Sequence, residues 1–245
     1  MTSTTSHPLD RLTPEEIERN RAIIVDAGHV TERTLFALVS LVEPDKREVV
    51  AGAGNIDRRV RSLIIDRASG EQTELLVSLT SNAVLLARVL DVTAEGQAPI
   101  TLTEYEESEQ MIRDDARWRA AVEKRGITDI ESVRICALSA GVFDIPGEEG
   151  RRLVRGSSFI QSTPDDNAWA HPLEGLVAYL DLNTGEVIEI IDTDVVPVPQ
   201  ERFDYHLDSW LPEPRTTQKP IEITQPEGAS FTLDGDVLTW EKWQV

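Results

Sequence analysis

The chain has 245 residues, of which 40% are hydrophobic and 28% charged, a balance typical of a soluble globular protein. Its formal net charge of −20 argues against nucleic acid or an anionic membrane as a partner, because a surface this acidic repels phosphates. No stretch is apolar for the roughly 18 residues that a membrane span requires, and the N-terminus lacks the features of a signal peptide. We therefore expect a cytoplasmic protein.

The first part of the chain predicts one helix followed by an antiparallel meander. Thr13 and Glu16 have the spacing of a capping box, and Pro14 suits the first helical position, where its missing N–H costs nothing. The helix is expected to end before Gly28. Apolar runs between turn residues then predict strands at 35–42, 49–53, 61–67, 74–80 and 84–91.

The same order of elements recurs after a linker at residues 96–99. A second helix is expected at 104–124, with a capping box formed by Thr103 and Glu106 and a stop at Gly126. Further strands are expected at 133–139, 152–161, 175–182 and 186–192. The repeat lies in the order of elements and not in the residues themselves.

These patterns predict an α+β fold with two successive small domains, each one helix packed on an antiparallel sheet, followed by the start of a further β region. The expected parts are a disordered N-terminus at 1–12, a first domain at 13–95, a second at 100–199, a linker at 200–228 and the new β region at 229–245.

The last residues predict a short hairpin that carries large apolar side chains, among them Trp240 and Trp243. An exposed hairpin edge of this kind is an aggregation liability. Either the hairpin pairs with the preceding domains or the natural protein continues beyond Val245, and we favour continuation.

The residues by themselves predict no catalytic, cofactor or metal site. The four histidines, His7, His29, His171 and His206, form none of the short pairings that ligate a metal, so a metal site would need distant loops. No glycine-rich phosphate loop or nucleophile elbow is present. Cys136, the only cysteine, is expected to be a buried, inert thiol on a strand.

Several short sequence motifs, in order along the chain, resemble those of the copper-containing, topaquinone-dependent primary-amine oxidases. The resemblance is closest to the bacterial phenylethylamine, tyramine and histamine oxidases. The motifs are HPLD at 7–10 with LTPEEI at 12–17, LSAGVF at 138–143 with GRRLVRG at 150–156, AWAHPLEGLVA at 168–178, RTTQKP at 215–220 with QPEGASF at 225–231, and WEKW at 240–243. The resemblance covers the chain from about residue 7 to its end.

This resemblance implies the second and third N-terminal domains of such an enzyme, with residues 229–245 as the start of its catalytic β-sandwich. Family members are homodimers that oxidise a primary amine to an aldehyde and release ammonia and hydrogen peroxide. Their copper, topaquinone and catalytic base lie in the catalytic domain. Tyr105, Tyr179 and Tyr205 do not match the motif of the quinone-forming tyrosine. The chain alone is therefore expected to be inactive, with no catalytic residue and neither cofactor bound.

The resemblance also implies a substrate-channel entrance formed by Tyr105, Leu138 and Trp169, with Tyr105 in place of an expected phenylalanine. An amphipathic, partly aromatic rim suits an organic ammonium substrate, because aromatic faces attract cations. The alternative for each residue is ordinary packing in the core. His171 lies outside the family's metal motif and is expected to make a structural hydrogen bond.

A second interpretation is a stand-alone, non-enzymatic binding module of two helix-on-sheet domains. It explains a chain without an active site equally well. It does not explain why Trp240 and Trp243 lie in a terminal hairpin.

Overall fold

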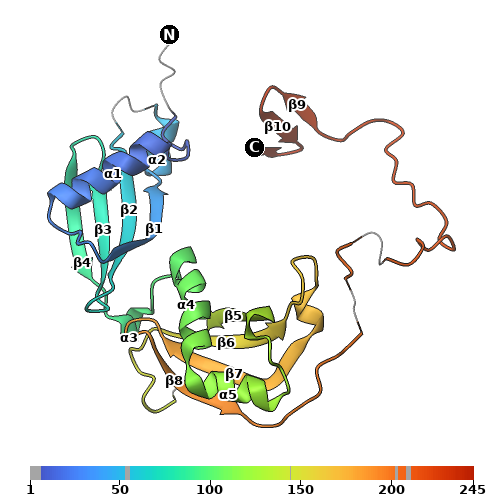
Figure 1. The fold of residues 1–245 in the computed structure, drawn as a ribbon. Helices are drawn as coiled ribbons and strands as arrows, with labels where there is room; N and C mark the ends of the chain where they lie inside the picture. Colours follow the sequence, from blue (N-terminus) through green and yellow to red (C-terminus); the bar gives the residue numbers. More distant parts are fainter. Residues whose placement is uncertain (1–6, 53–55, 144, 202–203, 208–210) are drawn as a thin grey trace. The chain divides into compact units, whose positions relative to one another are not determined.

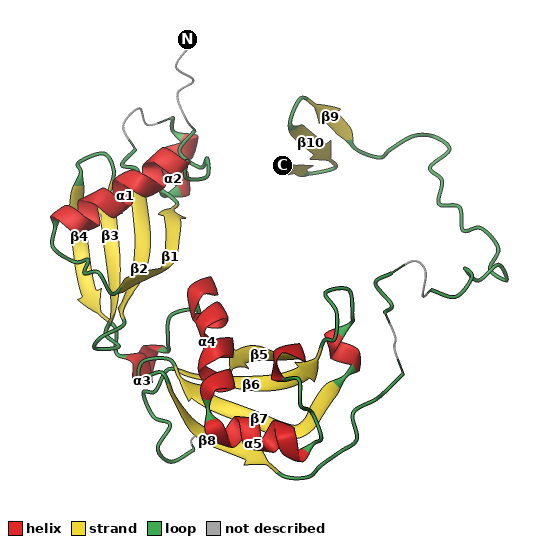
Figure 2. Ribbon diagram, viewed as in Figure 1, coloured by secondary structure: helices red, strands yellow, loops and turns green. Residues whose placement is uncertain are grey.

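The structure is a computed structural model that describes residues 7–52, 56–143, 145–201, 204–207 and 211–245 (Figure 1). The chain divides into two compact units, Met1–Asp204 and Tyr205–Val245. The first unit contains two four-stranded sheets, in the orders β1-β2-β3-β4 and β5-β6-β7-β8, with every neighbouring pair antiparallel. Helices lie against each sheet (Figure 2), so the predicted α+β class is confirmed. No helix among the described residues is long and apolar enough to cross a bilayer.

The first helix, α1 (Pro14–Asp26), begins as predicted, with Thr13 and Glu16 forming a reciprocal capping box. It covers one face of a sheet made by β1 (Thr34–Val42), β2 (Arg59–Asp66), β3 (Gln72–Ser78) and β4 (Ala83–Val89). The core between helix and sheet consists of fully or nearly buried aliphatic side chains, namely Ile23, Ile24, Val60, Ile64, Leu75, Val77 and Leu79.

The N-terminal segment is more ordered than its polar composition predicts. The Arg58 guanidinium donates hydrogen bonds to the backbone carbonyls of Pro8, Asp10 and Arg11 and forms an ion pair with Glu16 at 2.9 Å. The prediction of disorder is therefore wrong for the anchored residues 8–11. Residues 1–6 lie outside the described part of the chain.

The strand expected at 49–53 is also wrong, because residues 49 and 50 end the short helix α2 (Lys46–Val50) and residues 51 and 52 form a turn. Residue 53 lies outside the described part of the chain. Asp45 caps this helix, its carboxylate accepting the backbone N–H of Arg47 at 2.7 Å. An aspartate at the N-cap favours a helical turn, because its carboxylate satisfies a backbone N–H at the start of the helix. Residues 46–50 therefore satisfy backbone groups locally as a helical turn.

The second helix of the prediction is two helices, α4 (Leu102–Asp114) and α5 (Ala116–Lys124), which follow the short α3 (Val92–Glu95). The capping box is made by Thr101 and Glu104, two residues before the predicted pair. The chain breaks at Asp115, whose backbone is extended and whose carboxylate accepts the N–H groups of Arg117 and Trp118. Asp115 therefore starts a new helix where apolar spacing predicts a continuous one.

The second sheet follows the turn η1 (Ile130–Ser132) and comprises β5 (Val133–Ser139), β6 (Leu153–Ile160), β7 (Pro172–Asp181) and β8 (Glu186–Asp192), with η2 (Ala168–Ala170) between β6 and β7. Its four strands lie close to their predicted positions. Helices α4 and α5 cover one face (Figure 2), and the core there is formed by buried residues from both layers, among them Ile112, Trp118, Val122, Val133, Val154 and Leu180.

The second unit contains the predicted hairpin as three short strands, β9 (Thr232–Asp234), β10 (Val237–Trp240) and β11 (Trp243–Gln244), in the order β11-β10-β9. Its large side chains are open to solvent within the structure. Trp243 has 65% of its surface exposed and Trp240 46%. Whether this hairpin pairs with another part of a longer protein stays a prediction.

Candidate functional site

Leu138 lies on the open face of the second sheet, opposite the face covered by α4 and α5. Its neighbour Ala137 and the residue Ile135 are buried in the core. Side chains alternate between the two faces of a strand, so Leu138 points the other way and is exposed. Along the ladder it stands opposite Arg155, and Arg155 stands opposite Tyr179.

Trp169 reaches the same open face from the turn η2. Its ring meets Phe159 edge to face, with the ring centroids 4.7 Å apart, while 61% of the tryptophan surface remains exposed. Phe159 is paired with Arg134, which lies four residues before Leu138 on β5. Trp169 and Leu138 therefore share a face but are separated by about 13 Å along the strand.

Tyr105 does not join that face. It lies on α4, which covers the opposite side of the sheet, and borders a separate cavity together with Ser139 and Phe143. Neither Leu138 nor Trp169 lines this cavity. The structure thus brings two of the three predicted entrance residues onto one face and places the third around the edge of the sheet. Their role in a substrate channel stays a prediction.

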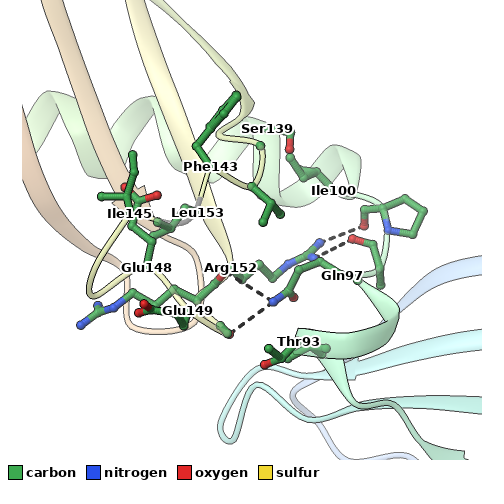
Figure 3. A pocket seen from close by; sticks show the side chains of 18 of the residues that line it. Thr93, Gln97, Ile100, Ser139, Phe143, Ile145, Glu148, Glu149, Arg152 and Leu153 are labelled. Atoms are coloured by element: carbon green, nitrogen blue, oxygen red, sulfur yellow. Dashed lines mark hydrogen bonds between the residues drawn. The ribbon is translucent and has the colours of Figure 1, made fainter.

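The cavity beside Tyr105, here called the linker pocket, lies between residues 92–100 and the segment 139–153 that leads from β5 into β6 (Figure 3). Its volume is about 530 Å³. Two apolar residues that follow β5 are largely exposed to solvent, Val142 at 89% and Phe143 at 69%. Sequence analysis did not identify this pocket, because residues 92–100 and 139–153 are joined only by tertiary contacts.

Arg152 lines the linker pocket and holds the linker by hydrogen bonds. Its guanidinium donates to both carboxylate oxygens of Glu104, at 2.7 and 2.8 Å, and to the backbone carbonyls of Ala98 and Pro99. Figure 3 also shows Gln97 donating to the carbonyls of Gly150 and Arg151, at 3.3 and 3.4 Å. These hydrogen bonds hold the linker against residues 150–152, just before β6, through partners that the sequence does not reveal.

The pKa of Glu104 reflects two opposing effects. Burial by itself raises the pKa of this carboxyl, but hydrogen bonds from Arg152 and Thr101 outweigh burial and lower the pKa below its ordinary value of 4.5. Glu104 is therefore a carboxylate at neutral pH and balances the buried Arg152. The ion pair holds the linker and the start of α4 against the residue that precedes β6.

The surroundings of Cys136 and His171 indicate structural roles for both side chains. Cys136 is half-buried, and burial raises the pKa of its thiol, which disfavours the reactive thiolate. The His171 Nδ1 lies 2.8 Å from the Pro199 carbonyl oxygen, which can only accept, so this nitrogen carries the proton. The structural hydrogen bond predicted for His171 is confirmed.

Within the described residues, no group of three or more histidine, cysteine, aspartate or glutamate side chains is placed to hold a metal ion. The residues present therefore do not fit the copper site that the resemblance implies for the catalytic domain, and no chemical step is assigned to a metal here. That the chain binds no copper stays a prediction.

Two protein families match separate parts of the chain. The AGAO-like N2 domain matches residues 13–86, and the N3 domain of copper amine oxidases matches residues 103–207. The first match contains α1 and most of the first sheet. The second contains α4 from its second residue, α5 and the whole second sheet.

Characterised relatives agree with these matches. The chain is 41% identical over 239 residues to a histamine oxidase of Arthrobacter globiformis, which covers 98% of this chain and 35% of the relative. It is 33% identical over 244 residues to a primary amine oxidase of Klebsiella aerogenes, covering 97% of this chain and 31% of the relative. The chain thus spans about a third of the length of the curated relatives it matches.

A solved copper-containing benzylamine oxidase from Hansenula polymorpha superimposes with a TM-score of 0.71 at 19% identity, over 98% of this chain and 40% of that structure. This likeness shows a shared fold. The fold and the matches together define a pair of helix-on-sheet domains of the kind found in copper amine oxidases. The chain belongs to the copper amine oxidase family and carries its N2 and N3 domains.

Proposed function

We propose that these two domains act within a copper and topaquinone primary-amine oxidase, whose catalytic domain lies outside residues 1–245. The observation that carries the proposal is the identity to amine oxidases along nearly the whole chain, over only a third of their length. The reaction would be the oxidative deamination of a primary amine to an aldehyde, with release of ammonia and hydrogen peroxide. The chain by itself would be inactive.

A chimera tests this proposal directly. Residues 1–245 would replace the matching third of the Arthrobacter globiformis histamine oxidase, and hydrogen peroxide release would be measured with histamine and with 2-phenylethylamine. We expect the chimera to turn over an amine and the isolated chain, supplied with Cu²⁺, to release no peroxide. Peroxide release by the isolated chain would contradict the proposal, and so would a folded, quinone-containing chimera without activity.

We also propose that the open face of the second sheet borders the route by which the amine enters, through Leu138 and Trp169, with Tyr105 at a more distant position. Support comes from the exposed aromatic surface of Trp169 and from its shared face with Leu138. Aromatic and aliphatic groups of this kind attract the ammonium and the tail of an aryl-alkyl amine.

The entrance role predicts a size-dependent effect in the same chimera. Trp169→Ala should lower kcat/KM for 2-phenylethylamine by about three- to tenfold, which corresponds to roughly 0.5–1.5 kcal/mol for one aromatic contact. The kcat/KM for methylamine, which has no aromatic group, should change little. The control is Leu86→Ala, which removes an exposed apolar side chain from β4 of the first sheet. Equal effects on both amines would argue against an entrance role.

Two other expectations, a homodimer for the whole enzyme and a cytoplasmic location, remain proposals. Sedimentation of the chimera and fractionation of the source cells would test them.

A further inference from the structure

Ala98, in the linker between the N2 and N3 domains, is held by both domains at once. Its backbone N–H donates to the Gln72 Oε1 on β3 at 2.6 Å, and its carbonyl accepts the Arg152 guanidinium at 2.7 Å. Its side chain is buried in a cluster with Leu63 and Ile65 of β2. A hinge residue must be able to change its backbone dihedral angles. Ala98 cannot do so without breaking its contacts to one domain or the other.

Side-chain amides extend this contact across the linker. The Gln72 side chain is buried, with 1% exposed, and its Nε2 donates to the Gln97 Oε1. The Gln97 Nε2 in turn donates to the carbonyls of Gly150 and Arg151 of the N3 domain (Figure 3). Both of these hydrogen bonds of the Gln72 amide, one from each end, reach the linker. The four residues that join the domains in this way are here called the domain clamp: Gln72, Gln97, Ala98 and Arg152.

Two further contacts join the domains away from the linker. Arg67, just after β2, donates from two nitrogens to the two carboxylate oxygens of Glu107 on α4. The turn before β3 also touches the turn after β7, because a methyl group added at Gly70 would lie 2.7 Å from the Asn183 Nδ2. A rotation of one domain about the linker would have to separate these contacts. The ion pair is about one-third exposed, at 32% and 37%, so it adds little by itself.

We propose that the domain clamp locks the N2 and N3 domains into one rigid body, with the buried amide of Gln72 as the group that prevents their rotation. Domains joined by a short linker ordinarily move relative to each other unless a large apolar interface holds them. Here buried hydrogen bonds to the linker take the place of such an interface. The orientation of the pair is then fixed before either domain meets another part of a protein. The proposal does not depend on the oxidase function.

Distances between two spin labels, one in each domain, test the clamp in the 245-residue chain. The labels would be attached at Glu18→Cys on α1 and Glu123→Cys on α5, two exposed helix positions, in a chain that carries Cys136→Ala. An excess of unlabelled chain removes distances between copies from the measurement. Pulsed electron paramagnetic resonance gives the distribution of distances, and we expect a single narrow distribution.

Two matched variants separate the clamp from a general loss of stability. Gln72→Met and Asn20→Leu each replace a buried amide with an apolar side chain of similar size, but the Asn20 amide bonds to Ser62 of its own domain at 2.9 Å. We expect Gln72→Met to roughly double the width of the distance distribution, because the freed linker allows domain motion. Asn20→Leu should leave the width unchanged. Both variants should lower the midpoint of thermal unfolding, since each leaves a buried polar partner unpaired.

The proposal fails if the parent chain already gives a broad distribution, if folded Gln72→Met keeps the parent width, or if Asn20→Leu broadens the distribution equally. Glu107→Gln should change the width little, because its ion pair is partly exposed. An effect as large as that of Gln72→Met would assign the lock to the surface ion pair and contradict the clamp.

A second variant decides the question if Gln72→Met does not fold. Gln97→Ala changes an exposed side chain, so it should keep the fold, and it removes the hydrogen bonds that join Gln72 to residues 150 and 151. It should broaden the distance distribution as well, and an unchanged width would refute the proposal. Ser62→Ala removes the same hydrogen bond as Asn20→Leu and can replace that control.

Discussion

At the scale of single residues, the buried pair of Arg152 and Glu104 has the largest predicted effect on stability. Both side chains are nearly inaccessible, 3% and 6% exposed, and Arg152 also satisfies two linker carbonyls. Replacing one member leaves the other charge buried without a partner, which is far more costly than removing both. The pair therefore connects the stability of the second sheet to the position of the linker.

Arg152→Met is predicted to destabilise the chain by about 3–5 kcal/mol, because Glu104 would remain as an isolated buried carboxylate. Urea unfolding followed by tryptophan fluorescence measures the change. Adding Glu104→Gln should recover part of the loss, since the uncompensated charge is removed. A loss below about 1 kcal/mol for the single variant would show that water reaches Glu104.

The same pair predicts a pH dependence of stability. Because the folded-state pKa of Glu104 lies below its ordinary value of 4.5, its stabilising contribution is complete above about pH 4.5 and is lost as the pH falls through the lowered value. The free energy of unfolding should thus fall on acidification from pH 5 towards pH 3. Glu104→Gln should be less stable at pH 7 and show a smaller fall. Parallel curves for the two proteins would assign the acid sensitivity to other carboxylates.

At the scale of elements, the close contact between α4 and the second sheet depends on Gly156 on β6. A methyl group added there would lie 2.5 Å from Ile112 Cδ1 and 2.8 Å from Ile135 Cγ2, so both isoleucines would have to move. The absence of a side chain lets the helix lie near the strand. The sequence shows a glycine in a strand, but only the packing explains its place.

Gly156→Ala is predicted to destabilise the chain by about 1–3 kcal/mol through overpacking. Ser157→Ala is the control, because its side chain lies on the other face of the same strand. Thermal unfolding of both variants would give the comparison. A neutral Gly156→Ala would mean that Ile112 can take another rotamer without cost.

Element boundaries show where sequence patterns succeed and where they fail. The strands of the second sheet follow from apolar runs between turn residues, and α1 follows from its capping box, because these signals are local. Residues 49 and 50, predicted to start a strand, instead end the short helix α2, and the predicted second helix breaks at Asp115. In both places a capping aspartate, Asp45 or Asp115, outweighs apolar spacing. For the candidate site, the resemblance selects individual residues, whereas the linker pocket requires contacts between distant segments.

At the scale of the whole molecule, the terminal unit predicts self-association. Trp240 and Trp243 are exposed on short strands with a free edge, and exposed apolar surface of this kind promotes contact between copies. The full chain should sediment as a mixture that grows with concentration, and a chain ending at Asp204 should sediment as one species. A full chain that is monomeric at all concentrations would contradict this and favour the binding-module interpretation.

The sequence by itself determined the α+β class and the positions of most strands, because capping boxes, turn residues and apolar runs act over a few neighbours. It also indicated the family, through motifs that resemble those of known members. The tertiary structure alone decided which residues meet. It joined Arg152 to Glu104 and to the linker, placed Leu138 and Trp169 on one face with Tyr105 apart, and enclosed the linker pocket. The physical reason is that burial and pairing between distant segments depend on how helix and sheet pack, which no short stretch of sequence contains.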